Sequence, residues 1–522
     1  MIKVLFVVLP DTSLYFNQLY LNYLIASCKK DKLLTIDVFF YNEEELLNKI
    51  SIYEPNIVYL HIDFMDFNIN MLIANKIKAI NPKIHLTCGY LYPSYYYKKI
   101  LSNTIIDTVI IGEPELSFRD LCHCLKKDIS FFRVKGLAFK DNGHVVVNQF
   151  RESEKELDNL PFPDRQNFEA TNSYYVFGSR GCANNCTFCC KNNLFLANKK
   201  PIQRFRTMNN LISELDELSE KHNCKHVIFG DATFCYPKKP EERLEELYSH
   251  LITKDYWMQF FMFLCPTQIN KRTCAALKRL IDLGLHRVFV GIETGNSEDL
   301  KLYNKNTSLA LSKRALEKLQ TLKKENDLNY YFEPEYGFMN FNPYSTFEKV
   351  RENVDFLQAC GVSINPNKII SKVLLYPDTT LAKMVIEDGL YNSYDDLGYV
   401  NDKFENSEIG LFYNELVYYY NLLRYKRTEG VIILANRYIR FFHKNDLIES
   451  TMKLFDEYEQ VTSDYTIQIF DRLYNKHKYK FTGDGDSFVK VAGNHLDKIY
   501  SQLDLNVKKI SLKLVRTGEF VK

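Results

Sequence analysis

The sequence predicts an α/β protein in three parts. These are an N-terminal doubly wound parallel sheet of the flavodoxin or Rossmann type, a (βα)6 partial TIM barrel, and a mostly helical C-terminal cap. Over residues 1–130 and again over 171–385, short β-branched and aromatic runs alternate with amphipathic helical stretches, as in parallel sheets. Over residues 386–522 apolar residues recur at helical spacing instead, and 522 residues suffice for three domains.

In residues 1–130, five predicted strands alternate with helices. The strands are Lys3–Leu9, Thr35–Tyr41, Asn56–His61, Lys83–Cys88 and Thr108–Ile111, and the helices include Tyr15–Lys29, Glu43–Ile52, Asn68–Ile80 and Tyr95–Leu101. Ligands of such sheets bind at the carboxyl ends of the strands, so His61 and Asp63 can line a site there. The alternative is a satisfied polar pair near the sheet edge.

Residues 131–170 form a predicted connector. Asp141-Asn-Gly-His144 separates two apolar runs, Val134–Lys140 and Val145–Asn148, which is typical of a β-hairpin. The segment Glu156–Asp164 carries two prolines, which favour an extended backbone that docking must order.

Residues 171–385 contain six strand candidates separated by helices. The strands are Tyr174–Gly178, His226–Gly230, Phe260–Cys265, Arg287–Ile292, Tyr330–Met339 and Lys368–Leu375, and the helices include Met208–His222, Glu241–Thr253, Lys271–Leu283, Leu309–Glu325 and Thr346–Cys360. In barrels of this kind the chemistry lies at the carboxyl ends of the strands.

Three cysteines follow the first barrel strand in a C-x3-C-x2-C array: Cys182, Cys186 and Cys189. Three thiolates on one loop can hold three irons of a [4Fe–4S] cluster and leave the fourth iron open to a small molecule. Phe188 would shield one side of that cluster. Zinc is the alternative, but closed zinc sites take four ligands, often in two cysteine pairs, and no second pair follows at that spacing. Cys190 is either a fourth nearby thiol or a packed residue.

This array resembles that of radical S-adenosylmethionine (SAM) enzymes with an N-terminal cobalamin-binding-like domain. The resemblance implies that the open iron binds the amino and carboxylate groups of SAM, and that the cluster supplies the electron that releases a 5′-deoxyadenosyl radical. Two strand ends, Phe229–Phe234 and Val290–Gly295, are similar to motifs of the same enzymes. By this resemblance Asp231 hydrogen-bonds the SAM amino group and Glu293 contacts the ribose. The alternative role of Asp231 is to cap the next turn.

Two loops in residues 1–130, Cys88–Ser94 and Ile110–Phe118, resemble the cobalamin-binding loops of that family. The resemblance assigns to cofactor binding the residues Cys88, Gly89, Tyr90 and Glu113. Cys88 stands where the family has glycine, and Tyr90 crowds a loop in which glycines let the backbone approach a ligand. No Asp-x-His-x-x-Gly motif supplies a histidine ligand for cobalt. Both possibilities stay open, a working cobalamin site and an inherited domain that no longer holds the cofactor.

Three further residues are candidates for catalysis. Glu333 and Glu335 alternate within one predicted strand and therefore share a face. If that face points into the barrel, either carboxylate could grip a substrate amine or transfer a proton, but burial would demand a partner. Cys265 ends the third barrel strand, where its thiol could donate hydrogen to a substrate radical. The alternatives are a solvated glutamate and a small buried cysteine.

The composition favours a globular enzyme of the cytoplasm. The formal net charge of +2 shows no broad field for nucleic acid or an anionic membrane, and no run reaches the roughly 18 apolar residues of a membrane span. Thirteen cysteines without a signal peptide predict a reducing compartment, where clustered cysteines indicate metal binding or catalysis. The resemblance adds the expected partners, a small-molecule or peptide substrate and an electron donor such as flavodoxin or ferredoxin.

The C-terminal residues 386–522 predict a helical cap over the open end of the barrel. Leu411–Arg424, Glu429–Phe442 and Lys444–Tyr458 have helical apolar spacing, Gly483–Asp486 predicts a loop, and Lys508–Arg516 predicts a final strand.

The expected function is radical SAM catalysis. If cobalamin binds, the leading reaction is methyl transfer to an unactivated carbon of a natural product or peptide. If it does not bind, epimerisation, rearrangement or bond formation is expected, with the N-terminal domain vestigial. The non-enzyme alternative is a metal-binding sensor, but Asp231 and Glu293 argue against it because a sensor needs no SAM contacts.

Overall fold

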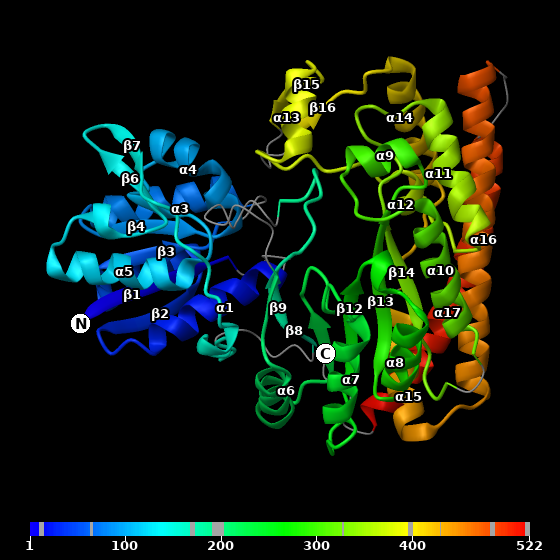
Figure 1. Cartoon of the computed structure of the whole chain (residues 1–522), viewed down its shortest axis with the longest axis horizontal. Helices are drawn as coiled ribbons and strands as arrows, with labels where there is room; N and C mark the ends of the chain where they lie inside the picture. The colour runs from blue at the N-terminus through cyan, green and yellow to red at the C-terminus, as the bar shows by residue number, and fades with distance from the viewer. Residues whose placement is uncertain are drawn as a thin grey trace.

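The computed structural model describes residues 1–9, 15–62, 66–166, 173–190, 203–325, 328–394, 400–428, 430–480 and 486–516. Figure 1 shows the N-terminal domain at the left, the barrel in the centre and the long C-terminal helices at the right. The predicted fold class is confirmed: parallel sheets come first and the C-terminal region is helical. Within the described residues, no helix is both long and apolar enough to cross a bilayer.

The N-terminal sheet has the strand order β2-β1-β3-β4-β5-β6-β7 and is parallel as far as β5. Its elements are β1 (Ile2–Val8), α1 (Tyr15–Lys29), β2 (Leu34–Phe40), α2 (Glu43–Tyr53), β3 (Ile57–Leu60), α3 (Phe67–Ile80), β4 (His85–Gly89), α4 (Leu91–Asn103), β5 (Thr108–Ile110) and α5 (Pro114–Lys127). The order of the first five strands is the flavodoxin order. The predicted hairpin, β6 (Leu137–Asp141) and β7 (His144–Val147), joins this sheet antiparallel, so the sheet continues beyond residue 130.

His61 is buried at the end of β3, and Asn70 donates a hydrogen bond to its carbonyl oxygen. Asp63 lies outside the described residues. The carboxyl ends of these parallel strands face the barrel (Figure 1).

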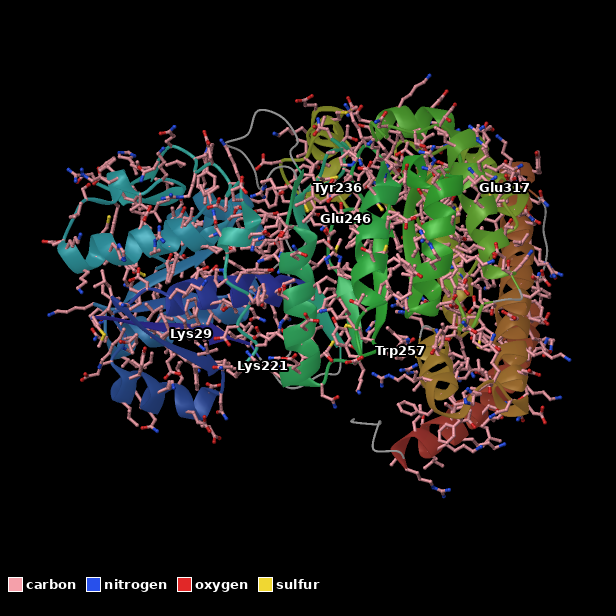
Figure 2. The ribbon with its side chains drawn as sticks, turned by 60° about the horizontal axis from the view of Figure 1, so that its bottom comes forward. Lys29, Lys221, Tyr236, Glu246, Trp257 and Glu317 are labelled. Atoms are coloured by element: carbon pink, nitrogen blue, oxygen red, sulfur yellow. The ribbon has the colours of Figure 1, made fainter. Side chains whose placement is uncertain are left out.

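The barrel sheet has five parallel strands in the order β14-β13-β12-β11-β8. Its elements are β8 (Ser173–Val176), the hairpin of β9 (Ser179–Gly181) and β10 (Gln203–Phe205), α6 (Met208–His222), β11 (His226–Phe229), α7 (Pro240–Leu251), β12 (Gln259–Leu264), α8 (Lys271–Asp282), β13 (Leu285–Glu293), α9 (Ser297–Leu302), α10 (Leu309–Lys323), β14 (Glu333–Phe338) and α11 (Phe347–Ala359). Side chains fill the space between sheet and helices, and Trp257 marks the end of the barrel where the strands begin (Figure 2).

The sixth barrel strand, predicted over Lys368–Leu375, is reduced in the structure to a single parallel bridge between Phe341 and Lys372. The chain forms the short helix α12 (Pro366–Ile369) instead. The Asn365 side chain accepts a hydrogen bond from the backbone of Lys368, and Pro366 occupies the first helical turn. Both features start a helix and compete with strand pairing. After it come α13 (Thr380–Glu387) and the hairpin of β15 (Tyr391–Tyr394) and β16 (Val400–Asp402).

The C-terminal helices are α14 (Ser407–Leu422), α15 (Gly430–Phe442), α16 (Asp446–Tyr479) and α17 (Asp486–Val515). They pack along the side of the barrel, and α15 lies at its lower end in Figure 1. The predicted strand Lys508–Arg516 is wrong, because Lys508–Val515 is the end of α17. Apolar alternation suggested a strand, but Ile510 and Leu514 are buried while Leu512 is 64% exposed, which is a helical pattern. The predicted loop Gly483–Asp486 falls mostly outside the described residues.

Candidate active site

The cysteine loop runs from β9 past the carboxyl end of β8. Cys182, Cys186 and Cys189 carry half-buried thiols. Burial raises the pKa of Cys186 to about 12. The neighbouring thiols of Cys189 and Cys182 and the carboxylate of Glu293 add to this rise, and the charge of Lys305 opposes it. The three predicted ligands therefore lie within electrostatic reach of one another. In the described part of the chain no three His, Cys, Asp or Glu groups converge on a single metal ion, whereas cluster cysteines bind separate irons and need no such convergence.

Contacts from several elements hold this loop in place. The backbone N–H of Thr187 donates to the Tyr303 carbonyl at 3.1 Å, and that of Leu381 donates to the Thr187 carbonyl at 2.9 Å. The Tyr95 hydroxyl, from α4 of the N-terminal domain, donates to the Cys190 carbonyl. Cys190 itself is 7% exposed. The loop is thus fixed by both domains.

Asp231 anchors the start of the loop. It follows β11, is 2% exposed, and accepts hydrogen bonds from the backbone of Gly178 at 3.0 Å and from the Ser179 hydroxyl. Burial raises the pKa of its carboxyl group, and the hydrogen bonds and Arg243 oppose that rise. Both carboxylate oxygens therefore contact the entrance to the cysteine loop, and the predicted contact with the SAM amino group stays a prediction.

Glu293 ends β13 in an unusual conformation. Its φ of +74° lies in the left-handed region, and the sheet is irregular between Gly291 and Glu293. A Cβ at Gly291 would stand 2.5 Å from the Glu293 Oε1, so only glycine lets the carboxylate fold back there. The Lys305 Nζ lies 3.1 Å from the same oxygen.

Lys305 is a site residue that the sequence did not reveal. It lies between α9 and α10, and its side chain is 10% exposed. Burial lowers the pKa of Lys305, but Glu293, Cys186 and Cys265 outweigh it, so the net shift is upward and the ammonium keeps its charge. A cation therefore lies beside the cysteine loop. No motif marks this lysine, which lies in the loop between α9 and α10.

Cys265 lies against the cysteine loop, and Phe188 belongs to the loop itself. The Asn184 side chain donates to the Cys265 Sγ at 3.4 Å, and burial raises the pKa of that thiol, which keeps it protonated. Phe188 packs edge-on against Tyr303 with ring centroids 5.3 Å apart, within an apolar cluster that includes Val373 and Leu375.

Glu333 and Glu335 share a face of β14 with a partner each. The register pairs Arg287 with Glu333 and Phe289 with Glu335 on β13. Lys323 donates a hydrogen bond to Glu333 at 2.6 Å, and Arg287 donates one to Glu335 at 3.3 Å. Each carboxylate therefore has the charged partner that a buried carboxylate needs. Glu333 begins β14 and so lies at the end of the strand opposite the cysteine loop.

The residues assigned to cobalamin binding are engaged within the protein. Cys88 is fully buried, and a Cβ at Gly89 would stand 2.9 Å from the Ile110 Cβ. Tyr90 has φ 81° and ψ −144°, a conformation almost restricted to glycine, and its buried ring stacks on Tyr20 at 4.0 Å.

Glu113 is engaged by the cysteine-loop hairpin. Arg204 of β10 donates to both of its carboxylate oxygens, at 2.7 and 3.1 Å, and Arg180 of β9 lies 3.6 Å away. Arg180 is 3% exposed and donates to Glu115 at 2.8 Å. Its guanidinium also lies over the rings of Tyr20 and Tyr23, at 4.9 and 4.6 Å from their centroids. Sequence reasoning found Glu113 but missed these arginines.

The central part of the chain matches a known protein family. The Radical SAM superfamily model matches residues 176–335. An uncharacterized methyltransferase of Pyrococcus horikoshii is 23% identical over 362 residues, 68% of this chain and 74% of that protein. The 4′-phospho-dehydrooxetanocin synthase of Priestia megaterium is 24% identical over 60% of this chain but only 44% of its own length.

Two solved structures share the fold. The cobalamin-dependent S-adenosylmethionine radical enzyme OxsB, with aqua-cobalamin bound, aligns with a TM-score of 0.70 and 16% identity over 100% of this chain and 82% of that one. The radical S-adenosylmethionine methyltransferase TsrM of Kitasatospora setae aligns with a TM-score of 0.60 and 14% identity over 75% of this chain and 78% of that one. At such low sequence identity, these structural alignments show a shared fold only.

Proposed function

Because the chain carries a radical SAM domain and is a radical SAM enzyme, we propose that Cys182, Cys186 and Cys189 hold its [4Fe–4S] cluster. When bound, the cluster and SAM supply a 5′-deoxyadenosyl radical that abstracts hydrogen from a small-molecule or peptide substrate. The observation that carries this proposal is the set of three half-buried thiols on one loop at the carboxyl end of β8. Soft thiolate donors suit iron–sulfur clusters, so these residues fit the group.

The chain's own groups around the loop suit the two ends of SAM. We assign Lys305 to the SAM carboxylate, because it is the cation beside Cys186 and Cys265. Glu293, 3.1 Å from Lys305, has a second carboxylate oxygen for the ribose hydroxyls. Asp231 acts by fixing Gly178 and Ser179, and hence the direction in which the cysteine loop leaves the strand.

Replacement of Lys305 tests the SAM site. Lys305→Gln is expected to raise the KM for SAM by about tenfold or more, because a charge-assisted hydrogen bond contributes about 1.5–3 kcal/mol. The change in kcat should be smaller. Initial rates of 5′-deoxyadenosine formation measure both. Lys305→Arg should recover part of the affinity, and Lys313→Gln, which removes an exposed partner of Glu317, should behave as wild type. An unchanged KM in Lys305→Gln would refute the assignment.

Cys265 is the proposed donor of a hydrogen atom to a substrate radical; the thiyl radical left on its Sγ would be reduced to the thiol by one electron from the electron donor and one proton from solvent. Burial keeps the thiol protonated beside the loop, as hydrogen donation requires. Glu335 lies deeper in the barrel and is already paired with Arg287, and Glu333 lies at the far end of β14. We therefore place Cys265 nearest the chemistry and Glu335 next, and we assign Glu333 to a different part of the molecule.

Cobalamin does not fit the residues that the sequence assigned to it. Cys88 is buried, Gly89 is packed against Ile110, Tyr90 stacks on Tyr20, and Glu113 is bound by Arg204. We derive no step through cobalamin and propose a radical reaction without it, such as epimerisation, rearrangement or bond formation. The second candidate is cobalamin-dependent C-methylation of a natural product or peptide, which is favoured by the whole-chain likeness to OxsB.

A cobalamin-retention experiment separates these candidates. We expect the anaerobically reconstituted enzyme, incubated with hydroxocobalamin and desalted, to keep well under one equivalent by absorbance. We propose that the Tyr90 side chain prevents cobalamin from approaching the backbone of the Cys88–Ser94 loop, so Tyr90→Gly should retain more cobalamin than wild type. Stoichiometric retention by wild type would overturn the cobalamin-free proposal and favour methylation, while leaving the assignment of the cysteines intact.

The reaction also needs an electron. We propose a flavodoxin or ferredoxin of the cytoplasm as the donor. Reduction of the reconstituted enzyme by purified flavodoxin, followed as 5′-deoxyadenosine formation, tests this partner.

A further inference from the structure

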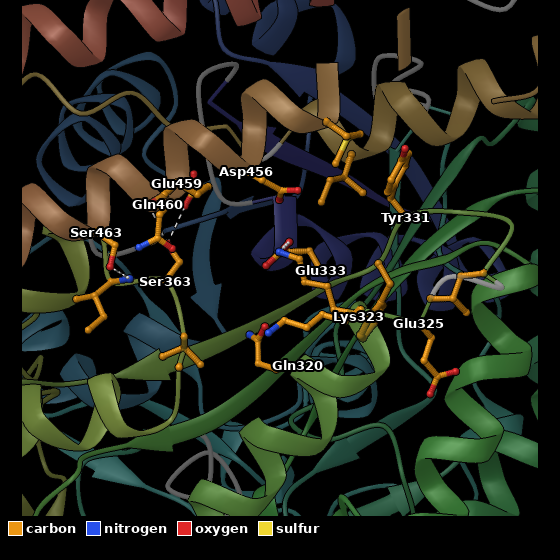
Figure 3. A pocket seen from close by; sticks show the side chains of 18 of the residues that line it. Gln320, Lys323, Glu325, Tyr331, Glu333, Ser363, Asp456, Glu459, Gln460 and Ser463 are labelled. Carbon is orange, nitrogen blue, oxygen red and sulfur yellow. Dashed lines mark hydrogen bonds and ion pairs between the residues drawn. The ribbon is translucent and has the colours of Figure 1, made fainter. Parts of the chain in front are cut away.

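A cavity of about 790 Å³ lies between the lower end of the barrel and the C-terminal helix α16. Its volume is within the range of ligand-binding sites. It is bounded by the end of α10, the beginning of β14 and one face of α16, so it lies at the end of the barrel opposite the cysteine loop. Figure 3 shows Asp456 and Glu459 entering from α16, with Glu333 and Lys323 on the facing wall.

The charges inside this cavity do not balance. Glu333, Asp456 and Glu459 lie around the ammonium group of Lys323, which pairs with Glu333 at 2.6 Å. Glu459 accepts hydrogen bonds from the neutral hydroxyls of Thr428, at 2.7 Å, and Ser363, at 3.2 Å. Asp456 has no hydrogen-bond or ion-pair partner among the residues that the structure describes. Two carboxylates therefore face the cavity without a cation.

The electrostatics of the three acids agree with this imbalance. Loss of water at the cavity wall raises the pKa of Glu333 and Glu459, and also that of Asp456, whose side chain stays partly exposed; Lys323 opposes the rise in each case. Asp456 also raises the pKa of Glu333 and Glu459, which means that the carboxylates repel one another. A ligand with positive charge would relieve both effects.

Two other lysines line the cavity, Lys324, which is exposed, and Lys444. Lys444 donates to the Leu328 carbonyl at 2.8 Å and lies over the ring of Tyr331. Glu325, also in the lining, is paired with Lys278 outside it. The apolar part of the wall, which includes Ile432, Met452 and Ile467, suits methylene groups.

The cavity is separate from the radical site. Glu333, Ser363 and Glu459 also line a smaller cavity of about 110 Å³, which reaches Glu335, Arg287 and Lys368. In that inner cavity Glu335 faces two cations, Arg287 at 3.3 Å and Lys368 at 4.0 Å. Above this inner cavity, the ring centroids of Phe289 and Phe263 are 5.4 Å apart. The Phe289 ring also packs on Gly337, where a Cβ atom would stand 2.9 Å from the ring. This aromatic pair stands between the lower cavities and Glu293.

We propose that the lower cavity binds an organic polycation, a linear aliphatic di- or triamine whose ammonium groups pair with Asp456 and Glu459. The methylene chain lies on the apolar wall. An inorganic divalent cation fits less well, because no three carboxylates in the described residues converge as metal ligands. The site is distinct from the one that binds SAM and requires neither the cluster nor a substrate.

Calorimetric titration of the full-length enzyme with spermidine tests the proposal. Saturable binding is expected, weakened by salt because charge pairs dominate it. Asp456→Asn should weaken binding by about tenfold or more, since it removes one charge-assisted hydrogen bond. Glu457→Gln, the next residue on the same helix but outside the cavity, should change the affinity little.

Three outcomes would overturn the proposal. The first is no saturable binding in the millimolar range. The second is equal weakening by Asp456→Asn and Glu457→Gln, which would indicate general attraction to an acidic helix. The third is Mg²⁺ binding that depends on Asp456 and excludes spermidine, which would indicate a metal site. Asp456 is exposed on the rim of the cavity and forms no hydrogen bond or ion pair with a described residue, so its asparagine variant should fold, and thermal unfolding with and without spermidine checks this independently.

Discussion

Replacing any one of Cys182, Cys186 or Cys189 with alanine is expected to abolish 5′-deoxyadenosine formation by the reconstituted enzyme. Each thiolate would bind one iron, and the three lie on one loop with mutual influence on the Cys186 thiol. Loss of residues that only support a metal ligand costs about 10–100-fold, so loss of a ligand itself should exceed that. Iron content, visible absorbance and the yield of 5′-deoxyadenosine measure the effect.

Cys190 supplies the matched control for this experiment. It is the next residue after Cys189, but its side chain is buried, and its backbone carbonyl accepts a hydrogen bond from Tyr95. Cys190→Ala should therefore keep the cluster and most of the activity. Full activity in one of the three loop variants, or loss of the cluster in Cys190→Ala alone, would show that the ligand set is assigned wrongly.

Most of the fold follows from local patterns because the buried strands are short and strongly apolar. The β1 segment has six of its seven residues buried, so its assignment does not depend on partners. The two failures both involve competition with a helix. In Lys508–Val515 the alternation of Ile510, Leu512 and Leu514 coincides with a helical stripe that begins further upstream, at Leu503. Near Lys368 a proline and an asparagine cap outweigh a strand-like composition.

The candidate site was predictable where one short motif carries it, and less so where distant segments meet. The three cysteines lie within one stretch of eight residues, so their spacing can be recognised directly in the sequence. Lys305 is close to Cys186 only because β13 and the turn after α9 return to the loop. The tertiary contacts of Glu113 with Arg204 were equally invisible, because the partners are separated by 91 residues. Sequence patterns report periodicity along one element and carry no signal for such pairs.

The position of Glu333 shows the same limit at finer scale. Alternation correctly placed Glu333 and Glu335 on one face of the strand. It did not give the distance of either carboxylate from the cysteine loop. In a parallel barrel the residues at the beginning of a strand belong to the stability face and those at its end to the catalytic face. Glu333 begins β14, whereas Glu293 ends β13.

Arg180→Ala is expected to lower the midpoint of thermal unfolding by on the order of 10 °C, because removing one partner of a buried ion pair costs about 3–5 kcal/mol. Arg180 is buried between Glu115 at 2.8 Å and the rings of Tyr20 and Tyr23, so its loss leaves a carboxylate unpaired between the two domains. Midpoints are compared between variants, since a protein of several domains need not unfold in two states.

Arg279→Ala is the matched control for this variant, because it breaks an ion pair with Glu245 in which both side chains are more than 40% exposed. Such surface pairs contribute about 0–1 kcal/mol, so the midpoint should move by only a few degrees. The double variant Arg180→Met with Glu115→Gln should recover part of the stability, because it removes the unpaired charge. Equal small shifts in Arg180→Ala and Arg279→Ala would disprove the account. Arg180 stands two residues before Cys182, so Arg180→Ala should also bind less iron, whereas Arg279→Ala should not.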